Sequence, residues 1–287
     1  MKKVNFAFFG SDTFSIDVLE ELIKNDFIPS LIISVPDKPK GRHMILTSPL
    51  IKDFAIKNKI PVTQPSTLDT DFVKSLMSSP STNFDLFIVA SYGKIIPKIV
   101  LDIPKFGTLN AHPSLLPKWR GSSPLQSTIL NNEQETGTTI ILVDEKMDHG
   151  PIIAQEKIAI KPWPLQVQEL ESILGKKSGI ILSEIIEPWL SGQIKAIPQD
   201  ENKATFTKKI KKEDGLIDLL SDTSKNYLKI CAYSNWPGTF FVEKTKKGEI
   251  RVSIKKAHLE ENSLVIERVI PEGKKEMDYR SFLNGLK

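Results

Sequence analysis

The chain has 287 residues, 40% of them hydrophobic and 26% charged, which is typical of a globular protein long enough for two domains. No apolar run approaches the roughly 18 residues needed to cross a bilayer, so we expect no membrane contact. The single cysteine, Cys231, excludes an internal disulfide and disfavours a cysteine-based metal cluster. These features predict a cytoplasmic protein without a metal.

The net charge of +4, from 39 basic and 35 acidic residues, is unevenly distributed. From Ala204 to the C-terminus there are 17 Lys and Arg against 12 Asp and Glu, and the rest of the chain is close to neutral. A basic C-terminal third suggests contact with a polyanion such as a nucleic acid. A solvated, lysine-rich surface explains the same count equally well, so the charge alone leaves both interpretations open.

Strand-like and helix-like segments alternate through the first half of the chain. Apolar runs predict strands, and apolar residues spaced three or four apart predict helices. We predict the following strands: 4–9, 31–35, 60–63, 84–90, 107–110 and 138–143. The predicted helices are 15–24, 49–58, 69–77 and 124–130, and the polar segment 36–43 predicts a loop. This alternation indicates an α/β fold with a doubly wound, mostly parallel, Rossmann-like sheet.

The pattern changes in the last third of the chain. A long amphipathic helix, 166–190, is interrupted by Gly175 and Gly179 and is followed by a polar segment. A helix at 221–232 then precedes three short β-like runs, which predict a second, smaller C-terminal β-barrel of the OB-like type. We therefore predict a catalytic domain, a linker and a C-terminal domain, with these boundaries: 1–195, 196–205 and 206–287.

The densest group of polar residues follows the predicted strand that ends at Asn110. Asn110 and His112 are two residues apart, so at the end of an extended strand both side chains point to the same side. An amide donor beside an imidazole suits oxyanion stabilisation and proton transfer at a carbonyl carbon. Asp148 lies in a Gly- and Pro-bounded loop after a later strand and is a candidate partner for His112. The chain has neither a Gly-x-Ser-x-Gly elbow nor a Gly-x-Gly-x-x-Gly loop after Gly10, which argues against serine hydrolases and dinucleotide binding.

Two of these segments carry a family resemblance. Asn110-Ala-His-Pro-Ser-Leu-Leu-Pro117, with the later Met147-Asp-His-Gly150, resembles the signature of the 10-formyltetrahydrofolate-dependent formyltransferases. Further matching stretches extend the resemblance over nearly the whole chain: 8–14, 36–42, 48–49, 90–97, 119–121, 135–137, 235–237 and 273–277. Within the family, the 36–42 loop and the C-terminal domain favour the members that formylate methionyl initiator tRNA.

The resemblance implies roles for particular residues. Asn110, His112 and Asp148 would be the catalytic trio, and His149 stands where a small residue is commoner. The residues expected to contact folate are Ser114, Leu115, Leu116, Pro117, Tyr92, Gly93 and Asp144, with the pterin ring held largely by backbone groups of 89–97. The residues expected to contact tRNA are Arg42, Lys38, Lys40, Lys208 and Lys209. No metal ligand is expected.

The implied reaction transfers the formyl group of 10-formyltetrahydrofolate, the co-substrate, to the α-amine of methionyl initiator tRNA for translation initiation. Asn110 and a protonated His112 would stabilise the oxyanion, and Asp148 would support the imidazolium. The expected partners are initiator methionyl-tRNA and folate, and the protein is expected to be a monomer. Two enzyme alternatives share the trio: a formyltransferase acting on an amino-sugar nucleotide, and a formyltetrahydrofolate hydrolase. A non-catalytic RNA-binding protein is a third alternative, which the intact trio argues against.

Overall fold

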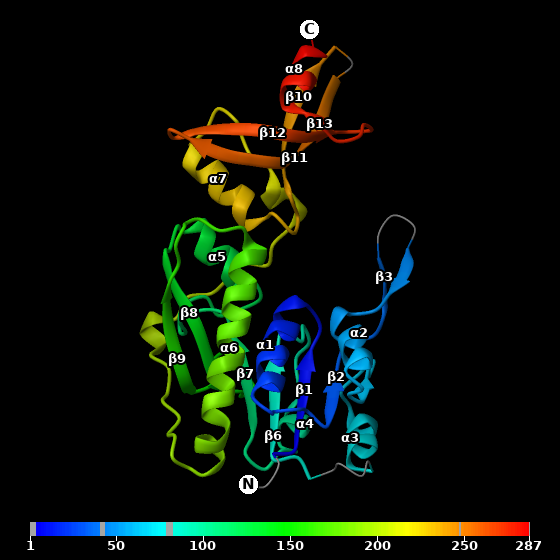
Figure 1. The fold of residues 1–287 in the computed structure, drawn as a ribbon, viewed down its shortest axis with the longest axis vertical. Coiled ribbons are helices and arrows are strands. Elements are labelled where there is room, and N and C mark those ends of the chain that lie inside the picture. The colour runs from blue at the N-terminus through cyan, green and yellow to red at the C-terminus, as the bar shows by residue number, and fades with distance from the viewer. Residues whose placement is uncertain (1–3, 41–43, 79–82, 247, 287) are drawn as a thin grey trace. The chain divides into compact units, whose positions relative to one another are not determined.

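The computed structural model describes residues 4–40, 44–78, 83–246 and 248–286 (Figure 1). Its strands are β1 Phe6–Gly10, β2 Leu31–Ile33, β3 Lys38–Lys40, β4 Ile45–Thr47, β5 Val62–Thr63, β6 Leu86–Ala90, β7 Thr108–His112, β8 Glu135–Leu142, β9 Ile152–Ala159, β10 Thr239–Thr245, β11 Gly248–Glu260, β12 Ser263–Pro271 and β13 Met277–Asp278. Its α-helices are α1 Thr13–Lys24, α2 Leu50–Lys57, α3 Thr70–Met77, α4 Lys98–Leu101, α5 Pro124–Leu130, α6 Val167–Leu190, α7 Thr223–Ala232 and α8 Tyr279–Asn284. Two short 3-10 helices are η1 Glu201–Lys203 and η2 Lys212–Gly215.

The main sheet has seven strands in the order β5-β2-β1-β6-β7-β8-β9. The pairs from β5 to β7 are parallel, and β8 runs antiparallel to β7. The predicted mostly parallel, Rossmann-like sheet is therefore confirmed. The register aligns Gly10 with Ala90 and Val89 with Asn110, so β1, β6 and β7 end at the same edge. Loops that carry ligand-binding residues in such sheets follow this carboxyl edge.

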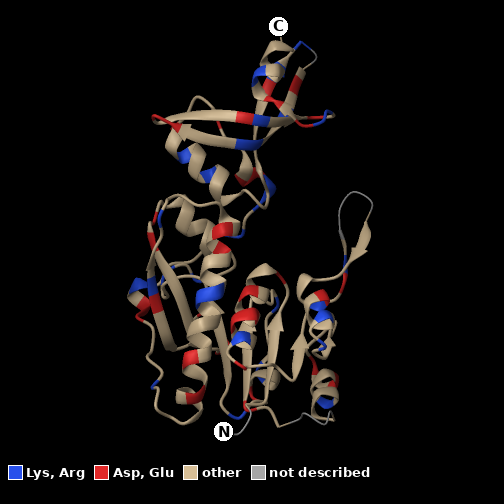
Figure 2. Ribbon diagram, in the orientation of Figure 1, with Lys and Arg blue, Asp and Glu red and all other residues tan. Residues whose placement is uncertain are grey.

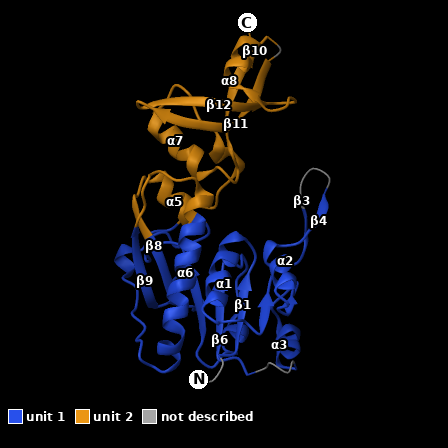
Figure 3. Cartoon of the chain, in the orientation of Figure 1, with its two compact units in different colours: residues 1–122, 137–158, 171–206 blue, residues 123–136, 159–170, 207–287 orange. Residues whose placement is uncertain are grey.

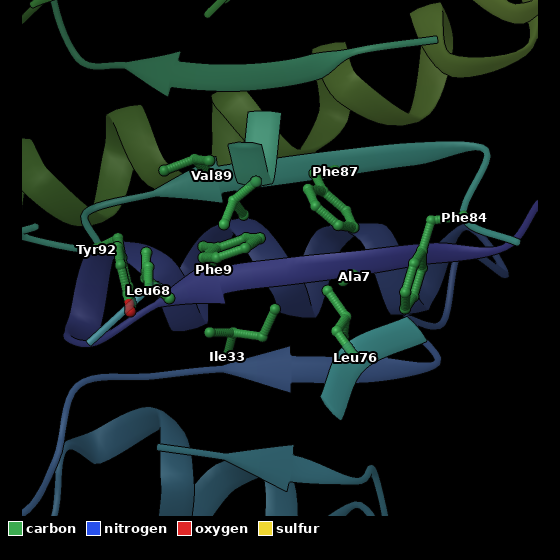
Figure 4. Close-up of a cluster of buried hydrophobic side chains, with 10 residues drawn as sticks. Ala7, Phe9, Ile33, Leu68, Leu76, Phe84, Phe87, Val89 and Tyr92 are labelled. Atoms are coloured by element: carbon green, nitrogen blue, oxygen red, sulfur yellow. The ribbon is translucent and has the colours of Figure 1, made fainter. Parts of the chain in front are cut away.

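Apolar side chains cover the central strands on both faces. Ala7 and Phe9 alternate with Phe6 and Phe8 along β1, and all four are fully buried. One face carries a cluster that includes Phe9, Phe87 of β6 and residues of α3 and α4 (Figure 4). Since both faces of β1 are buried, its apolar residues form a continuous run rather than an alternating one, as expected for a central parallel strand.

Two glycines of α6 allow that helix to approach α1 closely, and Figure 1 shows the two helices side by side. A Cβ atom at Gly179 would lie 2.5 Å from the carbonyl oxygen of Val18, and one at Gly175 would lie 2.8 Å from Cβ of Asp17. The glycines that interrupt the amphipathic pattern of this helix are thus required by packing, and the helix runs through them unbroken.

The segment after β2 differs from the predicted loop. Strands β3 and β4 form an antiparallel hairpin in which Lys38 pairs with Thr47 and Lys40 with Ile45. Pro39 is tolerated because each strand of a two-stranded ribbon has one edge without a partner strand. Met44, Ile45 and Leu46 are each more than 60% exposed, so β4 and the residue before it present apolar side chains to solvent. Strand β9 was also not predicted, although its exposure alternates in the strand manner.

The chain forms two compact units (Figure 3). The first contains residues 1–122, 137–158 and 171–206, and the second contains residues 123–136, 159–170 and 207–287. The second unit has a four-stranded antiparallel sheet in the order β10-β11-β12-β13, and its core includes Phe241 and Phe282. The smaller C-terminal β-structure is therefore confirmed, whereas the boundaries predicted at 195 and 205 stay a prediction. In the described ranges, no helix has the length and apolar character needed to traverse a bilayer.

Candidate active site

Strand β7 presents two of the predicted catalytic residues. Asn110 pairs with Val89 of β6 and with Ile141 of β8, and His112 pairs with Thr139 of β8. The sheet therefore holds the Asn110 backbone from both sides and the His112 backbone from the β8 side. Asn110 is partly buried, and the His112 side chain is 6% exposed. The two side chains consequently start from fixed positions, two residues apart on the same face of the strand.

Asp148 reaches this strand from the loop between β8 and β9. Its backbone is in the left-handed region, with φ of 50°. The loop passes so close to β8 that a Cβ atom at Gly150 would lie 1.8 Å from the carbonyl oxygen of Leu142, and only glycine fits there. The Asp148 carboxylate is 15% exposed, and its Oδ2 accepts a hydrogen bond of 2.8 Å from the backbone N–H of Gly121.

The three side chains converge on one oxygen. Oδ1 of Asp148 lies 3.4 Å from Nδ2 of Asn110 and 3.6 Å from Nδ1 of His112. Both contacts are longer than an ordinary hydrogen bond. Catalytic contacts are often loose in a ligand-free enzyme and tighten when the reacting groups are bound. The prediction that Asn110, His112 and Asp148 lie together is thus matched by their positions, and their catalytic role remains a proposal.

The other nitrogen of His112 has a partner of its own. Nε2 lies 3.0 Å from the carbonyl oxygen of Trp119. A carbonyl oxygen only accepts, so Nε2 carries a proton. Nδ1 is therefore the ring nitrogen that can gain or lose a proton. With a proton on Nδ1, this nitrogen would be a donor facing the Asp148 carboxylate.

The segment 114–117, expected to contact folate, is held firmly beside the trio. Ser114 is fully buried, and its hydroxyl donates to the carbonyl oxygen of Lys118 at 2.6 Å. Leu116 is 2% exposed, and its backbone bonds to Thr139 and Gln155. Leu115 lies against Gly137 and, like Pro117, is partly buried. Leu115 and Pro117 are therefore the more accessible members of the segment.

The other residues expected to contact folate are placed differently. The Tyr92 ring is 2% exposed and packs edge-on against Phe9, and burial raises its pKa to about 12. Only the backbone of Tyr92 remains available, and Gly93 beside it has φ of 75°. Asp144 bonds through Oδ2 to Nδ1 of His149 at 2.6 Å and through Oδ1 to the N–H of Lys146. Its contacts order the loop that carries Asp148.

The residues expected to contact tRNA lie in both units. Lys38 is exposed in β3 of the first unit, and Lys208 and Lys209 are exposed in the second. Lys40 belongs to the same hairpin as Lys38, while its side chain and Arg42 lie outside the described residues.

Charges of both signs lie along β11 and β12 (Figure 2). Lys256 pairs with Glu267 at 2.6 Å, and Arg268 pairs with Glu276 and Asp278. These two cations are thereby neutralised, whereas Lys208 and Lys209 are exposed and remain candidates for contact with phosphate.

Sequence reasoning missed a second group of residues around the site. Arg120 is 2% exposed and bonds to Gln199 and Glu201, which lie in the segment predicted as a polar linker. Gln199 in turn donates to the backbone of Asp148. No periodicity marks this arginine, because Lys118, Ser122 and Ser123 are among its sequence neighbours. Among the described residues, no group of three His, Cys, Asp or Glu side chains is arranged to hold a metal ion.

An amide, an imidazole and a carboxylate that meet at a strand end have the hydrogen-bonding groups that chemistry at a carbonyl carbon requires. Comparison with known proteins makes this chemistry more specific. Residues 2–186 match the family described as formyl transferase. The methionyl-tRNA formyltransferase of Halalkalibacterium halodurans is 34% identical over 98% of this chain and 95% of its own length. The chain therefore belongs to the formyl transferase family and is a formyltransferase.

Solved structures agree on the fold. A methionyl-tRNA formyltransferase from Clostridium thermocellum has a TM-score of 0.64 at 18% identity, and the match covers 96% of this chain and 99% of that one. A sugar 3N-formyl transferase, solved in the presence of dTDP and 5-N-formyl-tetrahydrofolate, has a TM-score of 0.60 at 20% identity and covers 93% and 94%. These likenesses extend over the whole fold and do not distinguish between acceptors.

Proposed function

We propose that this formyltransferase moves the formyl group of 10-formyltetrahydrofolate to the α-amine of methionyl initiator tRNA. One observation carries the proposal: Asn110 and His112 converge on Asp148 at 3.4 and 3.6 Å. They do so in a chain whose full-length relative is a methionyl-tRNA formyltransferase. Bound folate would supply an activated formyl group and a leaving nitrogen. Every other step falls to the protein's own residues.

The residues around the trio have the chemistry needed to hold a folate. The backbone after β6 follows the strand next to β7, so its N–H and C=O groups can pair with the polar edge of a pterin ring. Leu115 and Pro117 supply partly buried apolar surface in the same unit. Asp144 would act by ordering the Asp148 loop.

The catalytic residues divide the work according to their hydrogen-bonding groups. The Asn110 amide donates to the oxyanion that develops when the amine adds to the formyl carbon. Nε2 of His112 is engaged by the Trp119 carbonyl, so Nδ1–H is the second donor to that oxygen. Asp148 stabilises the imidazolium and helps the proton lost by the amine to reach the leaving nitrogen. The amine loses one proton and the leaving nitrogen gains one, so the transfer is balanced.

A single assay separates the candidate acceptors. The purified protein would be incubated with 10-formyltetrahydrofolate labelled in the formyl group and with charged initiator tRNA, an amino-sugar nucleotide or no acceptor. We expect label on the methionyl-tRNA. Label on the amino sugar would instead support a sugar N-formyltransferase activity, like that of the sugar 3N-formyl transferase of known structure. Release of formate without an acceptor would support a hydrolase, and either result would contradict the proposal.

Exposed cations would bind the tRNA backbone. Replacing Lys208 and Lys209 together with alanine should weaken tRNA binding at low salt and make it less dependent on salt, because each lost phosphate contact lowers the slope by about one. Binding of folate should be unchanged.

A monomeric state and a cytoplasmic location stay predictions. Light scattering would test the first and cell fractionation the second.

A further inference from the structure

Residues 199–206, which we call the strap, contact the loop that carries Asp148 and the segment 117–120, whose Trp119 carbonyl oxygen bonds to His112. The polar composition of this stretch predicts a solvated linker. Instead, its backbone and side chains bond to residues 117–120 on one side and to the Asp148 loop on the other. All of these residues belong to the first compact unit.

One end of the strap holds the Asp148 loop. Nε2 of Gln199 donates to the carbonyl oxygens of Asp148 and Gly150 at 2.9 and 2.8 Å. Oε1 of Gln199 accepts from Nε and Nη2 of Arg120 at 3.0 and 2.8 Å. Carbonyls only accept and guanidinium groups only donate, so a glutamine amide satisfies both sides in one orientation. This end therefore fixes the backbone from which the Asp148 carboxylate projects.

Arg120 and Glu201 anchor the strap to the site. The guanidinium is 2% exposed and makes two bonds with the Glu201 carboxylate, at 3.0 and 2.7 Å. The hydrogen bond from Arg120 lowers the pKa of Glu201 below its ordinary 4.5, so the carboxylate is charged at neutral pH. A buried guanidinium needs such a partner, because an unpaired charge in the interior is strongly destabilising.

The other end of the strap holds His112 through one intervening residue. The hydroxyl of Thr205 accepts from the Trp119 N–H at 2.9 Å. Backbone bonds join Thr205 to Pro117 and Arg120 at 3.1 and 2.9 Å. Trp119 has φ of 61°, which is uncommon for a bulky residue and persists only where its surroundings enforce it. That conformation presents the carbonyl oxygen that bonds to Nε2 of His112.

We propose that the strap positions both proton-handling side chains, Asp148 through Gln199 and His112 through Thr205, and thereby sets the rate of formyl transfer. Gln199, Glu201 and Thr205 are positioning residues that do not touch the substrates. The proposal rests on the function proposed above for the trio. Its consequence is kinetic: a loosened strap should slow the chemical step without weakening the binding of either substrate.

Two conservative changes test the two ends. Gln199→Glu keeps the oxygen that serves Arg120 but replaces the amide that serves the Asp148 loop. Thr205→Val removes the hydroxyl without changing the side-chain size, and Thr205→Ser restores it. Asn202→Ala is the matched control, since Asn202 is an exposed residue of the same strap.

We expect Gln199→Glu and Thr205→Val to lower kcat by about 10- to 100-fold, because small displacements of catalytic groups cost rate on this scale. KM for both substrates and the melting temperature should remain near those of Asn202→Ala, and Thr205→Ser should recover most of kcat. The proposal is overturned if kcat of both variants matches the control. It is equally overturned if KM and melting temperature deteriorate along with kcat and serine gives no rescue.

A measurement without substrate separates this proposal from the proposed function. In ligand-free protein labelled with 15N-histidine, the Nε2–H signal of His112 should move or exchange faster in Thr205→Val and stay unchanged in Asn202→Ala. If that change occurs while the wild type fails to formylate methionyl-tRNA, the acceptor is wrong and the positioning stands. If the wild type formylates methionyl-tRNA and the variants change neither signal nor rate, the strap proposal fails alone.

Discussion

Replacing Asp148 with asparagine removes the negative charge from the site while preserving its size. The retained amide oxygen can still accept the 2.8 Å bond from Gly121. The amide nitrogen then occupies the position of Oδ1 and turns a donor toward Asn110 and His112, where the wild type has an acceptor. The variant should therefore fold normally and fail in chemistry.

The distance between the charges sets the magnitude. An imidazolium and a carboxylate about 4 Å apart interact by about 4 kcal/mol at an effective dielectric of about 20, which suits a partly buried pair. Nδ1 and Oδ1 are 3.6 Å apart, and the Asp148 side chain is 15% exposed. If this stabilisation of the imidazolium is lost in the transition state, the rate of formyl transfer falls by about a thousandfold.

Single-turnover formylation at saturating substrate is the appropriate assay, because it isolates the chemical step from product release. Glu145→Gln is the matched control, since it removes one negative charge from an exposed position in the same loop. The control should react at nearly the wild-type rate. The reasoning would be refuted if Asp148→Asn, shown to be folded by its melting temperature and folate binding, turned over like the control.

Three further predictions concern the same unit. Asn110→Ala should lower kcat about 100- to 1,000-fold, as loss of one oxyanion donor does, and normal turnover would remove Asn110 from the mechanism. Gly150→Ala places a Cβ atom 1.8 Å from the Leu142 carbonyl oxygen, so it should destabilise the protein by about 1–3 kcal/mol and lower activity. An unchanged melting temperature and rate would contradict that close packing. Burial raises the pKa of Glu171, so its charge costs stability as pH rises above the ordinary 4.5. Glu171→Gln keeps the acceptor for Thr13, and unfolding curves should show its advantage over the wild type at neutral pH but not in acid, whereas equal advantages would contradict the raised pKa.

Periodicity was sufficient to predict the parallel sheet and the placement of two of the proposed catalytic residues. Apolar runs mark β1 and β6 because both faces of each strand are buried. The two-residue spacing of Asn110 and His112 puts them on one face of β7, which depends on nothing beyond the strand itself. The position of Asp148 could not be predicted in this way, because it depends on the conformation of the loop between β8 and β9.

The strap could not be predicted from periodicity. Gln199 and Thr205 act on backbone carbonyl and N–H groups of distant segments, and such groups leave no pattern in the sequence. A polar stretch without periodicity has the same composition whether it is solvated or bonded to a neighbouring loop. Tyr92 shows the opposite problem, since it was expected to contact folate and its side chain is buried in the core.

The position of the strap in the chain has a consequence for protein synthesis. The ribosome makes strand β7 with His112, and the loop with Asp148, well before it makes Gln199 and Thr205. A nascent or prematurely ended chain that stops before the strap thus has both of the proposed catalytic side chains and neither of the contacts proposed to position them. We therefore expect full activity to be acquired late in synthesis. A truncation after residue 195 would remove the strap together with the C-terminal sheet.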